Sequence, residues 1–370
     1  MNSNQSRTRR QVIHPLTAAA IILTPIQRVI VKFVDDVGFP YVDDVDQFFQ
    51  DPLAGLWQGL KAQFPGIAIK RLFTSLTDIQ INALVAQATA SDPAYKPPDF
   101  LSYFVVDCPQ PAADPELVAQ EIAAWPSVES AEAEGLLGPP PTVNPANNPR
   151  SEYQGYLDPA PKGIDARFSW TKVNPGGAGE GIGFVDMERG WTLNHDDLKA
   201  AGIGLISGLS QDEFEHGTGV LGIAAAVDNA IGDVGIATHT DAGVISEWRS
   251  PGVFNRADAI VAAVSVSGMN AGDVLLLETQ FWPGNGAAPL PIEVLSADFQ
   301  AIRLGIALGI VIIEPAGNGG QDLDAFTNAA GRQVLNRNSG DFQDSGAIMV
   351  GAATSNPVAH VRMVFSNYGS

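Results

Sequence analysis

Five prolines lie within residues 135–150, and they divide the chain into two parts with different sequence patterns. Proline has no backbone N–H and a fixed φ, so this stretch suits neither a helix nor a central strand. The 370 residues are also too many for one ordinary domain and enough for two. We therefore expect a leader of uncertain role at 1–27, a first domain at 28–135, a linker at 136–155 and a second domain at 156–370.

Ahead of the linker, apolar residues follow the periods of strands and helices in turn. The pattern predicts strands at 28–34, 67–73, 100–106 and 128–133, helices at 52–63 and 115–125, and an inserted helix near 78–88. The order βαββαβ is typical of a small α+β, ferredoxin-like domain, in which two helices cover one face of a four-stranded sheet. By itself, this fold indicates no function.

Beyond the linker, short runs that are apolar at every position alternate with glycine-rich turns and helical segments. These runs are 181–185, 202–207, 274–277, 309–313 and 347–350. Such runs suit parallel strands that are covered on both faces. We expect an α/β domain with a mostly parallel sheet and helices on both faces, whose reactive groups gather at the carboxyl ends of the strands.

Charge and cysteine content exclude several classes of function. A formal charge of −20 repels phosphate backbones and anionic membrane surfaces, so we expect neither a nucleic-acid nor a membrane partner. Cys108 is the only cysteine, so the chain forms no disulfide within itself. Its position at the end of an apolar run indicates a packed side chain, and no histidine motif accompanies it as a thiol nucleophile would require.

Three polar residues stand where buried runs end. Asp186 ends Gly-Ile-Gly-Phe-Val-Asp, His216 follows 30 positions later at the start of a small-residue helix, and Asn318 follows 102 positions after that. Taken singly, each also suits a structural role: a turn cap, a satisfied histidine in the core, or an asparagine in an unusual turn.

Together and in this order, the three residues resemble the subtilisin-like (S8) peptidase family, whose signatures are a strand ending in Asp, then His-Gly-Thr, then Ala-Gly-Asn. Here the second and third are His216-Gly217-Thr218 and Ala316-Gly317-Asn318. The resemblance runs from about 148 to 369. Further matching segments are 148–149, 153–154, 163–166 with Trp170, 195–198, Asn229 with 235–237, and 365–369.

The resemblance implies a serine endopeptidase that hydrolyses peptide bonds with an Asp-His-Ser triad and an asparagine oxyanion hole. His216 would take the proton of the serine hydroxyl, Asp186 would hold the imidazole in the correct tautomer, and Asn318 would donate to the oxyanion. A polypeptide substrate would lie as an added strand beside 274–280. The substrate-binding residues would be Glu278, Thr279, Gln280, Ala316 and Gly317.

The family's nucleophile lies in Gly-Thr-Ser-x-Ala-x-Pro, and that string is absent from residues 1–370. We therefore expect a C-terminally truncated peptidase domain that is inactive without its serine. Ser355, in Ala353-Thr354-Ser355-Asn356-Pro357, is a candidate substitute, but no pattern places it against His216. Met187, Gly219 and Pro315 also depart from the family's usual residues, which indicates a divergent branch.

Two other readings stay open. One is a catalytically inactive member of the fold that binds peptides, which the missing serine permits. The other is a structural or surface-attached α/β protein whose matches are remnants of a scaffold. The serine peptidase is the preferred reading because so many matches occur in order.

The first domain resembles the propeptide of the same family. This implies an inhibitory prodomain as an intramolecular partner, a tail at 134–150 lying in the cleft, and a zymogen cleaved within that tail. A prodomain favours export, yet Arg7, Arg9 and Arg10 followed by the apolar stretch 16–23 lack a good cleavage site for a signal peptide. The compartment therefore stays open.

No cofactor is required by this reading. Asp322 and Asp324 give little support for structural calcium, and the adjacent His195, Asp196 and Asp197 suit a solvated turn better than a metal site. The glycines of 177–181 precede a strand, whereas a dinucleotide loop needs them after one.

Overall fold

The computed structural model describes residues 27–134, 136–137, 153–172, 177–211, 214–229, 232–266, 268–284, 286–355 and 360–370. The leader up to residue 26, most of the predicted linker and Asn148-Pro149 lie outside the described residues.

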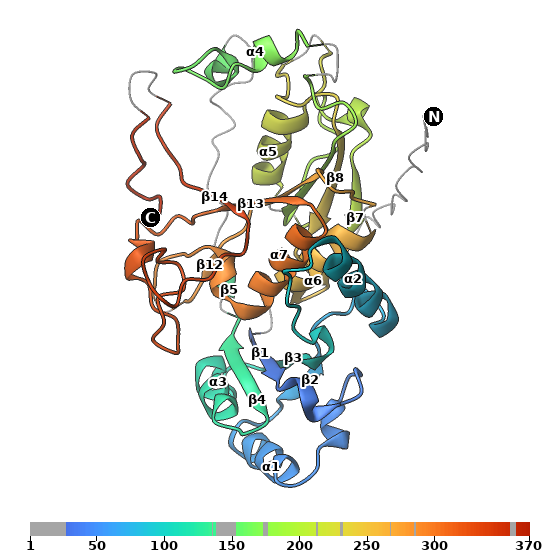
Figure 1. The fold of residues 1–370 in the computed structure, drawn as a ribbon, viewed down its shortest axis with the longest axis vertical. Helices are drawn as coiled ribbons and strands as arrows, with labels where there is room; N and C mark the ends of the chain where they lie inside the picture. The colour runs from blue at the N-terminus through green and yellow to red at the C-terminus, as the bar shows by residue number, and fades with distance from the viewer. Residues whose placement is uncertain are drawn as a thin grey trace.

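A four-stranded antiparallel sheet forms the N-terminal part of the molecule (Figure 1). Its order is β2-β3-β1-β4, which is the predicted ferredoxin-like arrangement. Alternate residues of β1 face a core that includes Trp57 of α1 and Ile122 of α3. The elements are β1 (Gln27–Phe33), α1 (Leu53–Gln63), β2 (Ala68–Arg71), β3 (Tyr103–Cys108), α3 (Pro115–Ala123) and β4 (Val128–Ala133).

The inserted helix α2 (Asp78–Ser91) lies away from the core of that sheet. A capping box starts it, in which Thr77 accepts from the backbone of Gln80 and the Gln80 side chain accepts from the backbone of Thr77. Ile81 and Leu84 belong to the larger core that contains α7, so the insertion joins the two parts of the chain.

A six-stranded parallel sheet forms the second part, in the order β14-β13-β11-β6-β8-β7. Its strands are β6 (Gly183–Glu188), β7 (Gly204–Ser207), β8 (Asp241–Ser246), β11 (Val274–Leu277), β13 (Val311–Pro315) and β14 (Ile348–Val350). The helices are α4 (Ala166–Ser169), α5 (Glu215–Ala225), α6 (Arg256–Val266) and α7 (Ser296–Ala307).

The prediction missed β8, which lies between β6 and β7. Its sequence, Asp-Ala-Gly-Val-Ile-Ser, contains only two large apolar residues, so it did not stand out as a buried run. The strand is nevertheless almost wholly buried, because neighbouring strands and helices cover it.

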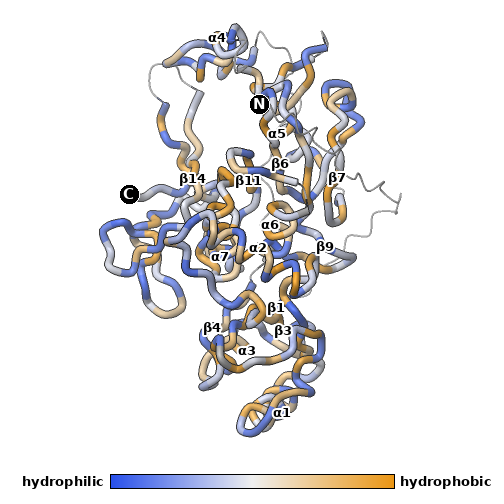
Figure 2. The backbone as a smooth tube through the Cα atoms, turned by 45° about the vertical axis from the view of Figure 1, so that its right-hand side comes forward, coloured by the Kyte–Doolittle hydropathy of each residue, from blue (hydrophilic) through white to orange (hydrophobic). Residues whose placement is uncertain are grey.

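Helices cover both faces of the parallel sheet, as predicted. Val244 of β8 belongs to the cluster that contains Leu221 of α5, whereas Ile245, the next residue, belongs to the cluster of α6 and α7. Successive side chains of a strand point to opposite faces, so α5 lies on one face and α6 and α7 lie on the other. Apolar stretches run along α6 in Figure 2.

Short elements complete the fold. β5 (Leu136–Leu137) pairs antiparallel with β12 (Phe281–Trp282), and β9 (Trp248–Ser250) pairs with β10 (Val253–Phe254). The 3-10 helices are Asp35–Val37, Val45–Phe48, Phe100–Ser102, Gly155–Leu157, Lys199–Ala201, Ile292–Val294 and Leu323–Ala325. None of the helices in the described ranges combines the length and apolarity that crossing a membrane needs.

Candidate active site

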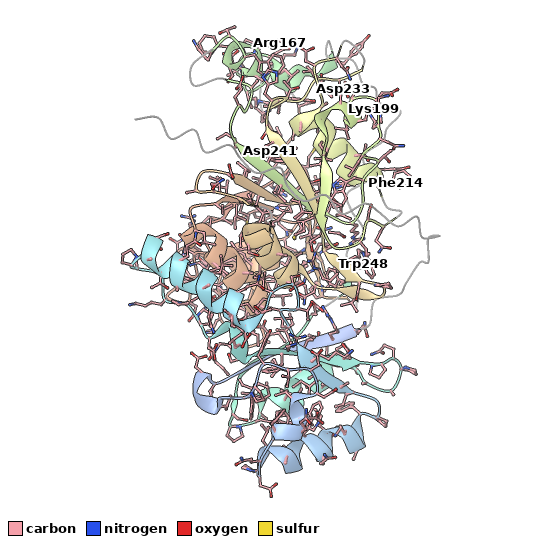
Figure 3. All side chains as sticks on the ribbon, turned by 90° about the vertical axis from the view of Figure 1, so that its right-hand side faces the viewer. Arg167, Lys199, Phe214, Asp233, Asp241 and Trp248 are labelled. Atoms are coloured by element: carbon pink, nitrogen blue, oxygen red, sulfur yellow. The ribbon has the colours of Figure 1, made fainter. Side chains whose placement is uncertain are left out.

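A buried carboxylate and a buried imidazole meet where β6 ends and α5 begins. Glu188 is the last residue of β6 and His216 is the second residue of α5, and their side chains are 2% and 7% exposed. The Nδ1 atom of His216 is hydrogen-bonded to Oε1 of Glu188. This pair has the form of an orienting acid and a general base. In Figure 3, Phe214 marks the start of α5.

Asp186 has another partner. It lies in the middle of β6 with no exposed surface, and its Oδ2 accepts from Nε1 of Trp191 at 2.7 Å. Its Oδ1 has no hydrogen-bond partner among the described residues. The prediction that Asp186 contacts His216 is therefore wrong in this structure, where Glu188 makes that contact.

The error has a physical origin in the length of the strand. We took the buried run to end at Asp186, but β6 continues to Glu188. The side chains of residues 186 and 188 point to the same face of the sheet, and only the later one reaches the carboxyl edge where α5 begins. The sequence signal for the end of β6 was Gly190, two residues after Glu188. The structure shows why glycine is needed there: a Cβ at 190 would lie 2.2 Å from the carbonyl oxygen of Gln211.

Burial shifts the pKa of Asp186, Glu188 and His216 in the direction that favours the neutral form of each side chain. It raises the pKa of Asp186 and of Glu188 well above the usual values, and the neighbouring carboxylate of Glu278 raises that of Glu188 further. Burial also lowers the pKa of His216. A neutral imidazole is the form that can accept a proton, so His216 is suited to act as a base near neutral pH.

Glycine is required beside the imidazole. A Cβ on Gly217 would lie 2.6 Å from the carbonyl oxygen of Gly190 and 2.7 Å from Cδ1 of Trp191. Distances below 3.0 Å are essentially never seen for real Cβ atoms, so any side chain at 217 would push α5 away from β6. Close packing at Gly217 thus sets the position of His216 relative to Glu188.

The predicted oxyanion donor lies in a loop directly after β13. The backbone N–H of Asn318 donates to Oε1 of Gln280 at 2.9 Å. Its side chain is partly buried, and its amide makes no hydrogen bond to any residue that the structure describes. A free amide that follows a parallel strand can donate to a ligand at the carboxyl edge of the sheet.

Asn367 holds this loop in place. Its Nδ2 donates to the carbonyl oxygens of Ala316 at 2.7 Å and Pro289 at 2.8 Å, and its Oδ1 accepts from Gln321 at 2.8 Å. Gly317 has φ of 94°, and a Cβ there would lie 2.8 Å from Nδ2 of Asn367. The sequence analysis included Asn367 only as part of the matching segment 365–369 and did not predict this role for it.

The predicted substrate-binding residues have different surroundings. Glu278 follows β11 and is partly buried, and burial raises the pKa of its carboxyl group. Thr279 is 7% exposed and its hydroxyl donates to Glu247 at 2.8 Å, while Gln280 holds the backbone of Asn318. The side chain of Thr279 is therefore turned toward Glu247, which leaves Glu278 as the side chain that faces His216.

Ser355 lies apart from the histidine in the sheet order. It is an exposed residue that follows β14, and β14 is separated from β6 by β13 and β11. Strands are spaced about 4.8 Å apart, so β14 lies about 14 Å from β6. No hydrogen bond in the described part of the chain links Ser355 to His216.

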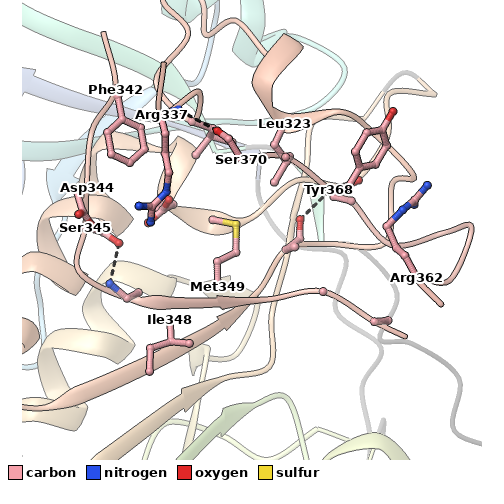
Figure 4. A pocket seen from close by; sticks show the side chains of 18 of the residues that line it. Leu323, Arg337, Phe342, Asp344, Ser345, Ile348, Met349, Arg362, Tyr368 and Ser370 are labelled. Carbon is pink, nitrogen blue, oxygen red and sulfur yellow. Dashed lines mark hydrogen bonds between the residues drawn. The ribbon is translucent and has the colours of Figure 1, made fainter. Parts of the chain in front are cut away.

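A cavity of about 680 Å³ lies among β14 and the segments around 335–345 and 360–370 (Figure 4). Ala316, Arg337, Met349 and Asn367 are among the residues that line it, but Glu188, His216 and Asn318 are not. The cavity is therefore distinct from the place where Glu188 and His216 meet.

A comparison of the sequence with curated proteins finds a match to a subtilisin. The chain is 30% identical over 184 residues to Subtilisin DY of Bacillus licheniformis, a match that covers 46% of this chain and 62% of that protein. Over that stretch the chain is similar to a subtilisin. The match spans less than two thirds of Subtilisin DY, and no family model matches this chain.

Solved structures with a similar arrangement include EpiP, an epidermin leader peptide processing serine protease of Staphylococcus aureus. It has 13% identity, covers 94% of this chain and 73% of its own, and gives a TM-score of 0.46. Fervidolysin from Fervidobacterium pennivorans has 14% identity and a TM-score of 0.42. That match covers 81% of this chain and 41% of fervidolysin. With TM-scores below 0.5, these structures add no argument to the assignment.

Proposed function

We propose that this chain is the N-terminal part of a serine endopeptidase in which Glu188 and His216 act as the acid and the base. The contact that carries the proposal is the hydrogen bond between Oε1 of Glu188 and Nδ1 of His216. In a serine peptidase, a carboxylate at Nδ1 fixes the tautomer in which Nε2 accepts the proton of the serine, and it stabilises the imidazolium that forms. Glu188 thus takes the role that the sequence assigned to Asp186.

Asn318 is proposed as the oxyanion donor. Its amide is free of hydrogen bonds within the described chain, and Gln280 and Asn367 fix the loop that carries it. A donor fixed before the reaction stabilises the charge that develops on the carbonyl oxygen without reorganising. A polypeptide is the proposed substrate.

The reaction also needs a nucleophilic serine. No Gly-Thr-Ser-x-Ala-x-Pro string occurs among residues 1–370, so the proposal assigns the serine to a segment encoded after Ser370. The same observation favours one alternative, a catalytically inactive relative that binds peptides.

Labelling by a fluorophosphonate separates the two functions. The complete gene product is expected to be labelled on one serine, and His216→Ala is expected to abolish labelling because the hydroxyl then has no base. Mass spectrometry of the labelled peptide locates the serine. A complete product that binds peptides but takes no label, with or without His216, would leave only the inactive alternative.

The four-stranded domain is proposed as an inhibitory prodomain. The chain directly after this domain forms β5, which pairs with β12 just after the predicted substrate segment that ends at Gln280. Glu132 of β4 accepts from the backbone N–H of Ser296 at 2.8 Å, and Asp258 of α6 accepts from the N–H groups of Thr74 and Ser75 at 2.9 Å each. A buried ion pair between Arg28 and Glu134, 2.6 Å long, lies where the domain ends.

Autocatalytic cleavage tests this part of the proposal. We expect the complete product to be cut within 134–150, and its activity to appear as the cut accumulates, because the tail then leaves the cleft. Intact-mass measurements alongside a peptide-hydrolysis assay follow both events. His216→Ala should stay uncut, and full activity in an uncut wild-type protein would contradict the prodomain role.

A further inference from the structure

Three potential metal ligands converge at the site. Among the described residues, Glu188, His216 and Glu278 are the one group of three for which each side chain offers a ligand atom within 4.8 Å of the others. They come from the end of β6, the start of α5 and the residue after β11. In the sheet order, β6 and β11 are neighbours, so this convergence is a product of the fold.

The spacing of the three atoms is close to what a metal ion requires. Zinc binds nitrogen and oxygen ligands at about 2.0–2.2 Å, which places neighbouring ligand atoms about 3.3 Å apart in a tetrahedron. Small side-chain adjustments from spacings below 4.8 Å would reach this geometry. His216 and Glu188 would move slightly apart as the ion replaced the proton that they share.

The charges of the group also favour a cation. Two of the three ligands are acidic side chains, and Glu188 is buried while Glu278 is partly buried. The Glu278 carboxyl group makes no hydrogen bond within the part of the chain that the structure describes, so its oxygens are available to a ligand.

We propose that Glu188, His216 and Glu278 bind one divalent transition-metal ion of the zinc type, with the fourth position open to water. One imidazole nitrogen and two carboxylate oxygens match the ligand preferences of such ions, and three protein ligands with an open position are a common zinc arrangement. The ion would occupy the acid and base of the proposed peptidase, so it would inhibit hydrolysis; this consequence rests on the proposed function, whereas the binding does not.

Direct titration of zinc chloride into the 370-residue chain tests the site without any activity assay. Isothermal titration calorimetry is expected to show one equivalent bound, and cobalt(II) in place of zinc is expected to give the visible absorption of a low-coordinate site. His216→Ala and Glu278→Gln should each weaken binding at least about 10-fold, because even the loss of an outer-shell partner has an effect of that size.

A second histidine–glutamate pair provides the matched control. His239 Nδ1 lies 3.1 Å from Oε1 of Glu180, both side chains are exposed, and no third ligand joins them in the described ranges. His239→Ala should leave zinc affinity unchanged. Circular dichroism checks that each variant folds. If His216→Ala does not fold, the zinc affinity of Glu278→Gln alone tests the site, since the Gln side chain keeps the size of Glu.

Three results would overturn the proposal: no stoichiometric zinc binding, unchanged affinity in Glu278→Gln, or equal loss in His239→Ala and His216→Ala. Failure of the proposed function looks different. If zinc binds with the expected pattern yet leaves the peptidase activity of the complete product unaffected, the metal site stands and the assignment of Glu188 and His216 as catalytic residues fails.

Discussion

Glu188→Gln is expected to lower the kcat of the complete peptidase about 10⁴-fold, the loss that follows when the acid of a serine-peptidase triad becomes an amide. The amide cannot hold the imidazole in the productive tautomer or stabilise the imidazolium. Asp186→Asn is expected to stay within about tenfold of wild type, because Asp186 bonds to Trp191 and not to His216. Steady-state hydrolysis of a peptide substrate by both variants gives the comparison.

The 370-residue chain allows the same comparison without the serine. The proton between His216 and Glu188 should give a strongly downfield imidazole signal in the proton NMR spectrum, because the hydrogen bond joins a buried acid and a buried base. The signal should vanish in Glu188→Gln and persist in Asp186→Asn. The reverse pattern would return the role of the acid to Asp186.

Asn318→Ala is expected to reduce kcat of the complete peptidase about 10²–10³-fold with little change in KM, a size established on subtilisin itself. The amide has no hydrogen bond in the described chain to lose, so the folded structure should remain as stable as wild type. Steady-state kinetics combined with thermal unfolding separates the two effects.

Two further variants show whether the loss at Asn318 is specific. Asn338→Ala changes an exposed asparagine that, like Asn318, lies between β13 and β14, and it should leave kcat unchanged. Asn367→Ala removes the three hydrogen bonds that this buried side chain makes to the loop and its neighbours, so it should lower both activity and stability. If Asn318→Ala were as destabilising as Asn367→Ala, Asn318 would be a structural residue and not an oxyanion donor.

The sequence was sufficient to predict the elements whose patterns are local. Alternation and helical spacing placed the four strands and two helices of the first domain, and uniformly apolar runs marked five of the six parallel strands. β8 was missed because Asp241 and Gly243 interrupt its apolar pattern, although the neighbouring strands bury it. Its burial comes from tertiary packing, which local composition does not report.

The sequence by itself indicated the histidine at the start of a helix, the asparagine after a buried strand and an acid in the strand before them. Only the tertiary structure decided which acid contacts His216 and that Glu278 joins them. The reason is geometric: Asp186 and Glu188 are two residues apart on one face of β6, and their roles depend on where the strand ends against α5. That end is set by close packing among Gly190, Trp191 and Gly217, which are contacts between separate segments of the chain.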